Sequence, residues 1–275
     1  MSEREDQLKA LQQTLQAGQF EAGLAQAQSM LADEPVDGEA LYMAAVAARY
    51  LKRFDDAATH LAALHAAMPE YGRAWQEEGH LALARGDTAG ALGAFSRAVR
   101  FNPALAASWR EQARLLAAAG RAGEAQVATA QFERLQKLPR ELLAVTNHLA
   151  EGRLLRAEEI CRHYLRQNPR DVEGMRLLAR IGIELGVLED AEFLLESATE
   201  FAPEDVQVRL DYIDVLRRRQ KFEAARAQAE SLYQRDPDSP VFQSRLAIEC
   251  IQTGEFDLAL NLFDTAFGNI PADAA

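Results

Sequence analysis

Side chains that could bind a metal or act as nucleophiles are few in this chain of 275 residues. The two cysteines, Cys161 and Cys250, cannot form a Cys-x-x-Cys pair, and we expect both to be buried thiols that pack as small hydrophobic residues. His60 and His65 are five residues apart, a poor spacing for one helix face, and His148 lies in an apolar column. The sequence therefore predicts no metal site and no cofactor.

Known catalytic sequence patterns are also missing. The chain has no Gly-x-x-x-x-Gly-Lys-Ser/Thr phosphate loop, no Gly-x-Gly-x-x-Gly, no Gly-x-Ser-x-Gly and no His-Glu-x-x-His. We therefore predict no catalytic residue and no enzymatic activity within these residues.

The charge balance restricts the classes of partner. The chain has 42 acidic and 30 basic side chains, a net charge of −12, which disfavours nucleic acid and anionic membranes. The basic cluster at 217–221 is expected at a helix end, where cations complement the helix dipole. The start is charged, and no apolar run is long enough to span a membrane, so we expect a soluble cytoplasmic protein.

Prolines and glycines show that the elements carrying the remaining polar residues repeat every 34 residues. Three prolines and then four more follow this spacing: Pro35, Pro69, Pro103, and Pro169, Pro203, Pro237, Pro271. Glycines follow it independently, at Gly18, Gly86, Gly120, Gly152, Gly186 and Gly254, with Lys52 and Gln220 in the two vacant places. A small residue comes five positions after each: Gly23, Ala57, Ala91, Ala125, Ala157, Ala191, Ala225 and Ala259.

Each marker has a physical reason. A residue that ends a helix with positive φ favours glycine, a small residue lets two helices approach closely, and proline stops the second helix. The period therefore predicts helical hairpins in one continuous array over residues 1–275. The predicted repeats are 4–37, 38–71, 72–105, 106–137, 138–171, 172–205, 206–239 and 240–273.

The pattern of these units resembles the tetratricopeptide repeat. The third unit matches it most fully, through Trp75, Gly79, Gly86, Ala91, Phe95, Ala98 and Pro103, whereas Leu41, Met175 and Arg209 depart from its tryptophan position. The resemblance implies an all-α fold, a right-handed superhelical solenoid of about eight repeats. It also implies a non-catalytic scaffold that binds a protein or peptide in the concave groove of the superhelix.

A narrower resemblance covers Leu149 to Phe267. Leu-Ala-Glu-Gly-Arg-Leu from Leu149 and Gly-Val-Leu-Glu-Asp-Ala from Gly186 are similar to the repeat region that precedes the catalytic domain in bacterial tetratricopeptide sulfotransferase family proteins. The resemblance implies that this chain is the N-terminal part of a sulfotransferase-like protein. An intact sulfotransferase is the alternative, disfavoured because no donor-binding loop occurs.

The last predicted helix has an apolar face that a further repeat would cover. Leu258, Leu260, Leu262, Phe263 and Phe267 lie on it, and only a short segment follows before Ala275. We therefore expect either a following domain or a partner, and self-association through this repeat is an alternative function that makes the chain a homo-oligomer.

The inner wall of such an array is built from the first helix of each unit, and positions 2, 5, 6, 9, 12 and 13 face it by helical spacing. The candidate binding residues are Tyr42, Arg49, Tyr50, Arg73, His80, Arg110, Arg114, Arg176 and Arg180. Arginine suits carboxylates, which favours a protein or peptide partner with acidic groups. The alternative is that these arginines pair with Glu and Asp of neighbouring helices. The Lys and Asn set with which chaperone-binding repeats hold a terminal carboxylate does not occur at these positions.

Overall fold

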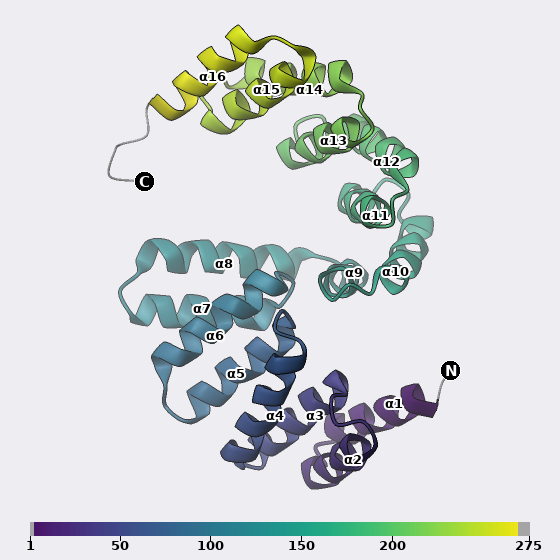
Figure 1. Ribbon diagram of the computed structural model, residues 1–275, viewed down its shortest axis with the longest axis vertical. Helices are drawn as coiled ribbons and strands as arrows, with labels where there is room; N and C mark the ends of the chain where they lie inside the picture. Colours follow the sequence, from purple (N-terminus) through teal and green to yellow (C-terminus); the bar gives the residue numbers. More distant parts are fainter. Residues whose placement is uncertain (1–2, 269–275) are drawn as a thin grey trace. The chain divides into compact units, whose positions relative to one another are not determined.

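The computed structural model describes residues 3–268, which form sixteen α-helices and no strand (Figure 1). The all-α prediction is therefore confirmed for this part of the chain. The chain divides between Gly152 and Arg153 into two compact units, called unit 1 and unit 2 below. The arrangement of the two units as one continuous array stays a prediction.

Unit 1 contains four helical hairpins and a ninth helix. Its helices are α1 (Glu3–Gln16), α2 (Phe20–Asp33), α3 (Gly38–Tyr50), α4 (Phe54–Ala67), α5 (Gly72–Ala84), α6 (Thr88–Phe101), α7 (Ala106–Ala118), α8 (Ala122–Lys137) and α9 (Arg140–Ala150). Within each hairpin the two helices pack together, and the second helix packs on the first helix of the next hairpin. The first helices α1, α3 and α5 also contact each other in order, so they form a common face.

Unit 2 repeats the same packing. Its helices are α10 (Leu154–Gln167), α11 (Val172–Glu184), α12 (Leu188–Phe201), α13 (Val206–Arg218), α14 (Phe222–Arg235), α15 (Pro240–Thr253) and α16 (Phe256–Gly268). Each helix packs on the next, and the first helices α11 and α13 also touch. The end of the eighth predicted repeat, including Pro271, lies outside the described residues.

The turn inside each hairpin has the backbone conformation that the glycine spacing predicts. All six glycines of that column have φ between 69° and 85°. Lys52 and Gln220, which occupy the two places without glycine, also have positive φ, 61° and 59°. Because a side chain in this left-handed region is strained, the position itself, rather than the residue, dictates the turn.

The small-residue column is buried at the helix crossings, as expected. Ala57, Ala91, Ala157, Ala191 and Ala225 have no exposed surface. Gly79 shows how close the helices come, since a β-carbon built there would lie 2.7 Å from the ring of Phe95. Larger side chains at these positions would force the paired helices apart.

The tryptophan position of the repeat holds a hydrogen-bond donor in four units, even where the residue is not tryptophan. Trp75 and Trp109 donate from their indole N–H to the carbonyl six residues earlier, at 2.8 Å and 2.9 Å. Arg209 and Gln243 make the equivalent bond to the proline carbonyl six residues before them, at 3.0 Å and 2.7 Å. These substitutions therefore keep the bond that ties each first helix to the preceding proline turn.

Candidate functional site

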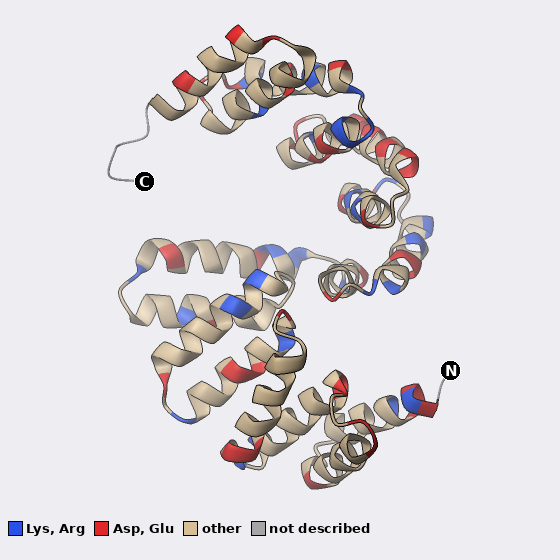
Figure 2. Ribbon diagram, viewed as in Figure 1, with Lys and Arg blue, Asp and Glu red and all other residues tan. Residues whose placement is uncertain are grey.

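The nine predicted binding residues lie on first helices, divided between the two units. Unit 1 holds seven of them on α3, α5 and α7, and the exposed surface of these helices is called the unit 1 face below. Unit 2 holds the other two, Arg176 and Arg180, on α11. Figure 2 shows basic and acidic residues intermixed along the helices of both units. Which arginines are available to a ligand depends on the partners that each one already has.

Arg49 is occupied by a carboxylate from the next repeat. Its guanidinium binds Glu77 of α5 in a bidentate ion pair, with Nη2 donating to Oε2 at 3.2 Å. Glu77 is 4% exposed, so this carboxylate is almost fully removed from water. The guanidinium also lies 4.5 Å from the ring centroid of Tyr50. Arg49 therefore links α3 to α5 and has little capacity left for a ligand.

Arg73 is occupied in a similar way by a residue beyond α9. Its Nε lies 2.6 Å from a carboxylate oxygen of Glu151, whose side chain is nearly buried. A second contact joins the amide group of Asn102, which follows α6, to that of Asn147 in α9 at 3.1 Å. The α9 segment thus covers part of the unit 1 face next to α5.

The tyrosines near Arg73 form an aromatic group. Tyr42 meets the ring of Tyr71 edge-on, with centroids 6.0 Å apart, and the Tyr71 hydroxyl donates to Glu39 at 3.3 Å. Burial, reinforced by the charge of Glu77, raises the pKa of Tyr42 to about 12. This hydroxyl therefore stays protonated and neutral at physiological pH.

Tyr50 and His80 retain exposed surface on the unit 1 face. Tyr50 is exposed and stacks on Phe20 with parallel rings whose centroids are 4.3 Å apart. His80 is half-buried and meets Phe95 edge-on at 5.1 Å, and burial lowers the pKa of its imidazole. A ligand on this face would therefore meet a rigid aromatic surface and a neutral imidazole.

Arg110 and Arg114 on α7 are the open part of the unit 1 face. Both are more than half exposed and share one carboxylate, Glu111, at 3.2 Å and 2.9 Å. Partial burial raises the pKa of Glu111, but the hydrogen bond from Arg114 and the charges of Arg114 and Arg110 lower it below its usual value. Two guanidinium groups with one carboxylate leave several N–H donors facing solvent.

The corresponding face of unit 2 carries linked ion pairs. Arg176 binds Glu173 at 2.6 Å and Asp211 of α13 at 2.8 Å. Farther along, Asp214 accepts from Arg217 at 3.0 Å and from Arg245 at 2.6 Å. Arg176 is thus occupied.

Arg180 differs from Arg176 on the same helix. It is exposed, and no described residue forms an ion pair with it. Arg180 is therefore the predicted residue of unit 2 that is free to meet a ligand.

The cysteines behave as the sequence predicts. Both are free, buried thiols, and Cys161 donates to the carbonyl of Gly174 at 3.3 Å. Burial, together with the charge of Asp171, raises the pKa of Cys161 to about 12, and burial also raises that of Cys250. Within the described residues, no group of three or more His, Cys, Asp or Glu side chains is arranged to hold a metal ion.

Comparison with known families agrees with this repeating geometry. Two profiles described as tetratricopeptide repeat match the chain, one at residues 148–212 and the other at residues 12–75 and 185–240. Together they cover more than half of the sequence. The chain belongs to the tetratricopeptide repeat family.

No curated protein shows significant sequence similarity to this tetratricopeptide repeat chain. Among solved structures, a chain of Naa15/Naa10 bound to HypK-THB has 16% identity and a TM-score of 0.45, covering 96% of this chain and 45% of its own. A chain of the APC/C hetero-tetramer Cut9-Hcn1 has 15% identity and a TM-score of 0.41, and the match covers 90% of this chain and 49% of that chain. A thermophilic tetratricopeptide repeat protein of Thermus thermophilus has 22% identity and a TM-score of 0.43, and the match covers 77% of this chain and 98% of that chain.

This chain thus spans about half the length of the first two of these proteins. The resemblance to sulfotransferase repeat regions stays a prediction. Among the described residues, no helix is both long and apolar enough to cross a bilayer.

The repeat pattern of the sequence predicts only some of the carboxylates that pair with the arginines. Glu77, Glu111 and Asp211 occupy wall positions of the repeats, so helical spacing places them near the arginines that they bind. Glu151 lies after α9 and outside the wall positions, and its pairing with Arg73 depends on how α9 packs. No repeat position indicates that contact.

Proposed function

We propose that this chain is a non-catalytic scaffold that binds an extended, acidic segment of a partner protein on its first helices, the surface that would form the concave groove of the array. The family assignment supports a protein-interaction scaffold. Specificity for an acidic segment is supported by the arrangement of Arg110 and Arg114, which are exposed and share the single carboxylate of Glu111.

The two arginines are suited to a carboxylate because they lie one turn apart on α7. Ligand oxygens there would receive charge-assisted hydrogen bonds from donors that now face solvent. The exposed ring of Tyr50 and the half-buried His80 offer contact area on neighbouring helices of the same face. Arg49, Arg73 and Arg176 are assigned instead to holding the repeats together, since each already binds a carboxylate.

The test is titration of the full chain with a short fluorescent peptide rich in glutamate, followed by anisotropy. The double variant Arg110→Glu/Arg114→Glu should weaken binding at least about tenfold, because it replaces two attractive charges with two repulsive ones. The matched control is Arg100→Glu/Arg134→Glu, which makes the same charge change on the second helices α6 and α8. Unchanged affinity in the first variant, or an equal loss in the control, would remove the proposed site.

A peptide with glutamine in place of glutamate provides the second control. Its affinity should be low and insensitive to salt, whereas binding of the acidic peptide should weaken as salt screens the exposed charges. Circular dichroism of each variant should match the wild type, because the substituted side chains are exposed.

The resemblance of residues 149–267 to sulfotransferase repeat regions supports a finer proposal, in which the array positions polypeptide for a sulfuryl-transfer domain. The purified chain should then transfer no sulfuryl group from a labelled donor. Turnover by the chain alone would overturn its assignment as non-catalytic.

A further inference from the structure

The last described helix, α16, presents an apolar stripe that the described residues leave largely exposed. Phe256, Leu260, Phe263 and Phe267 follow at intervals of four, three and four, which places them on one side of the helix. Phe256, Leu260 and Phe267 are 65%, 62% and 56% exposed, and Phe263 packs on Phe267 with ring centroids 5.9 Å apart. This stripe is distinct from the face through which α16 packs on α15, where Ala259, Leu262 and Ala266 are buried.

The stripe is bordered by negative charge. Asp257 and Asp264 are seven residues apart, so they form a row along the solvent side of the apolar residues. From Leu246 to the last residue the sequence contains no Lys or Arg. The exposed surface of α16 is therefore apolar and acidic.

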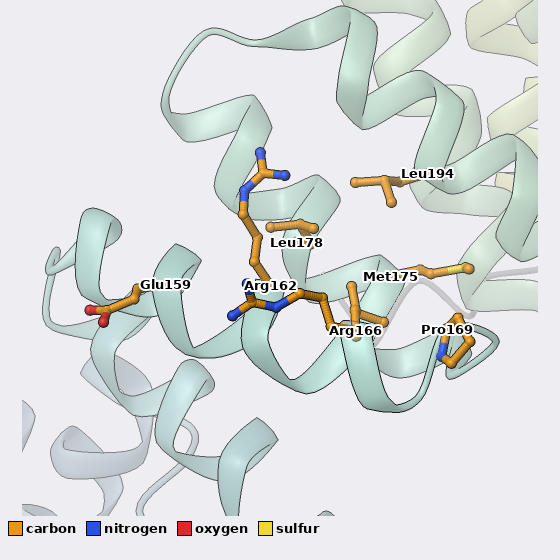
Figure 3. A pocket seen from close by; sticks show the side chains of 8 residues that line it. Glu159, Arg162, Arg166, Pro169, Met175, Leu178 and Leu194 are labelled. Atoms are coloured by element: carbon orange, nitrogen blue, oxygen red, sulfur yellow. The ribbon is translucent and has the colours of Figure 1, made fainter.

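A pocket elsewhere in unit 2 has the complementary character. It lies between α10, α11 and α12, with a volume of about 540 Å³. Its apolar part comes from Leu165, Pro169, Met175, Leu178 and Leu194, and its polar part from Glu159, Arg162 and Arg166. Figure 3 shows both arginines extending from α10, with Leu178 beside Arg162 and with Met175 and Leu194 farther along the pocket.

Arg166 is a cation of this pocket that has no described acidic partner. Its guanidinium lies 3.2 Å from the Nδ1 atom of His163, and no described carboxylate pairs with it. Arg162 is exposed and binds Glu158 within its own helix at 2.7 Å. Glu159 is engaged by Arg156, so it does not neutralise Arg166. The pocket thus joins an apolar floor to at least one cation that lacks an acidic partner.

A single copy cannot bring these two surfaces together. Within unit 2, α13, α14 and α15 pack in sequence between α12 and α16 (Figure 1). Within unit 2, α16 therefore does not reach the pocket of its own copy. A second copy of this chain carries a helix with the required apolar stripe and acidic border.

We propose that α16 of one copy docks into the pocket between α10, α11 and α12 of a second copy. Phe and Leu side chains of the stripe would contact Leu178, Leu194 and Met175, and Asp257 or Asp264 would bind Arg166. Because the two surfaces differ, the contact is head to tail, and each assembly keeps one free surface of each kind at its ends. This inference uses surfaces of unit 2 and is independent of peptide binding on the unit 1 face.

Sedimentation velocity of the full chain from about 1 µM to about 500 µM tests the association, since this range spans the affinities of small interfaces. The wild type should grow with concentration beyond a dimer. The pocket variant Arg162→Glu/Arg166→Glu and the helix variant Leu260→Gln/Phe267→Gln should each weaken association at least about tenfold. The control Val36→Gln/Val127→Gln alters equally exposed apolar residues of unit 1 and should leave association unchanged.

Mixing the two defective variants distinguishes this contact from any symmetric one. The pocket variant retains an intact α16 and the helix variant retains an intact pocket, so an equimolar mixture should form a one-to-one dimer that grows no further. A wild type that stays monomeric over the whole range would overturn the proposal. Association that survives both variants, or a mixture that remains monomeric, would overturn it as well.

Discussion

The first helices of the two units use arginine in different ways. In unit 1, Arg49 and Arg73 each bind a nearly buried carboxylate, and the arginines of α7 share a partner and face solvent. In unit 2, Arg176 binds two carboxylates that are both partly exposed. Arginines at wall positions of the repeats therefore form buried structural pairs, exposed charge networks or open binding groups.

The difference shows what makes a repeat position available for binding. An arginine is occupied when a carboxylate lies within reach on a neighbouring helix or, for Arg73, beyond α9. It stays open when no carboxylate pairs with it, as for Arg180, which has no described ion-pair partner although Glu184 follows four residues later on α11. The number of arginines on a face thus says less about a binding site than the number of their partners.

Breaking one pair in each unit should give the largest contrast. Glu77→Ala removes the nearly buried partner of Arg49 and should lower the free energy of unfolding by about 3 kcal/mol, because an unpaired guanidinium stays half-buried. Asp211→Ala should cost no more than about 1 kcal/mol, since Arg176 keeps Glu173 and the pair is partly exposed. Urea denaturation followed by circular dichroism measures both.

An exposed pair supplies the reference for these losses. Asp56→Ala removes the i,i+3 partner of Arg53, where both side chains are about half exposed, and should change stability by less than about 0.5 kcal/mol. Equal losses for Glu77→Ala and Asp56→Ala would contradict the distinction between buried and exposed pairs.

The two buried glutamates should respond in opposite directions when neutralised. Glu77 accepts two hydrogen bonds from Arg49, whereas Glu249 of α15 is fully buried and no described residue donates a hydrogen bond to its carboxylate. Burial raises the pKa of Glu249, although the charges of Arg217 and Arg245 lower it, and Arg217 lies 3.6 Å away. We expect Glu77→Gln to destabilise the fold and Glu249→Gln to stabilise it by about 1 kcal/mol at pH 7.

The pH dependence of Glu249→Gln has a definite sign. A raised pKa in the folded state means that the native protein takes up this proton more readily than the unfolded chain. Wild-type stability therefore gains from Glu249 as pH falls from the raised pKa to the ordinary glutamate value near about 4.3. The advantage of Glu249→Gln should shrink as pH falls through that range. A constant advantage in urea denaturation from pH 7 to pH 4 would contradict this account.

The fold could be predicted from sequence because its markers depend on local backbone geometry. Proline, positive φ and small side chains act within one hairpin, so a period of 34 residues is sufficient to place the turns. The division after Gly152 was not predicted, because it depends on packing between hairpins rather than on any local residue.

The candidate site could be predicted only in part, for the same reason. Helical spacing places Arg110, Arg114 and Arg180 on first helices, and all three are exposed. Spacing alone does not reveal that Arg73 meets Glu151, since this contact requires the residue after α9 to lie next to α5. Nor does it reveal the pocket lined by Arg166, which three helices form together. Contacts between distant segments are the part that a repeat pattern leaves open.

The turn that both units share provides a further small effect. Lys52 in unit 1 and Gln220 in unit 2 hold positive φ without being glycine. Lys52→Gly and Gln220→Gly should each raise the free energy of unfolding by about 0.5 kcal/mol, because relief of left-handed strain outweighs the greater freedom of glycine in the unfolded chain. Gly86→Ala makes the reverse change, at φ 80°, and should cost about 1 kcal/mol. If Lys52→Gly and Gly86→Ala shifted stability in the same direction, backbone strain would not govern this turn, and the glycine spacing would need another cause.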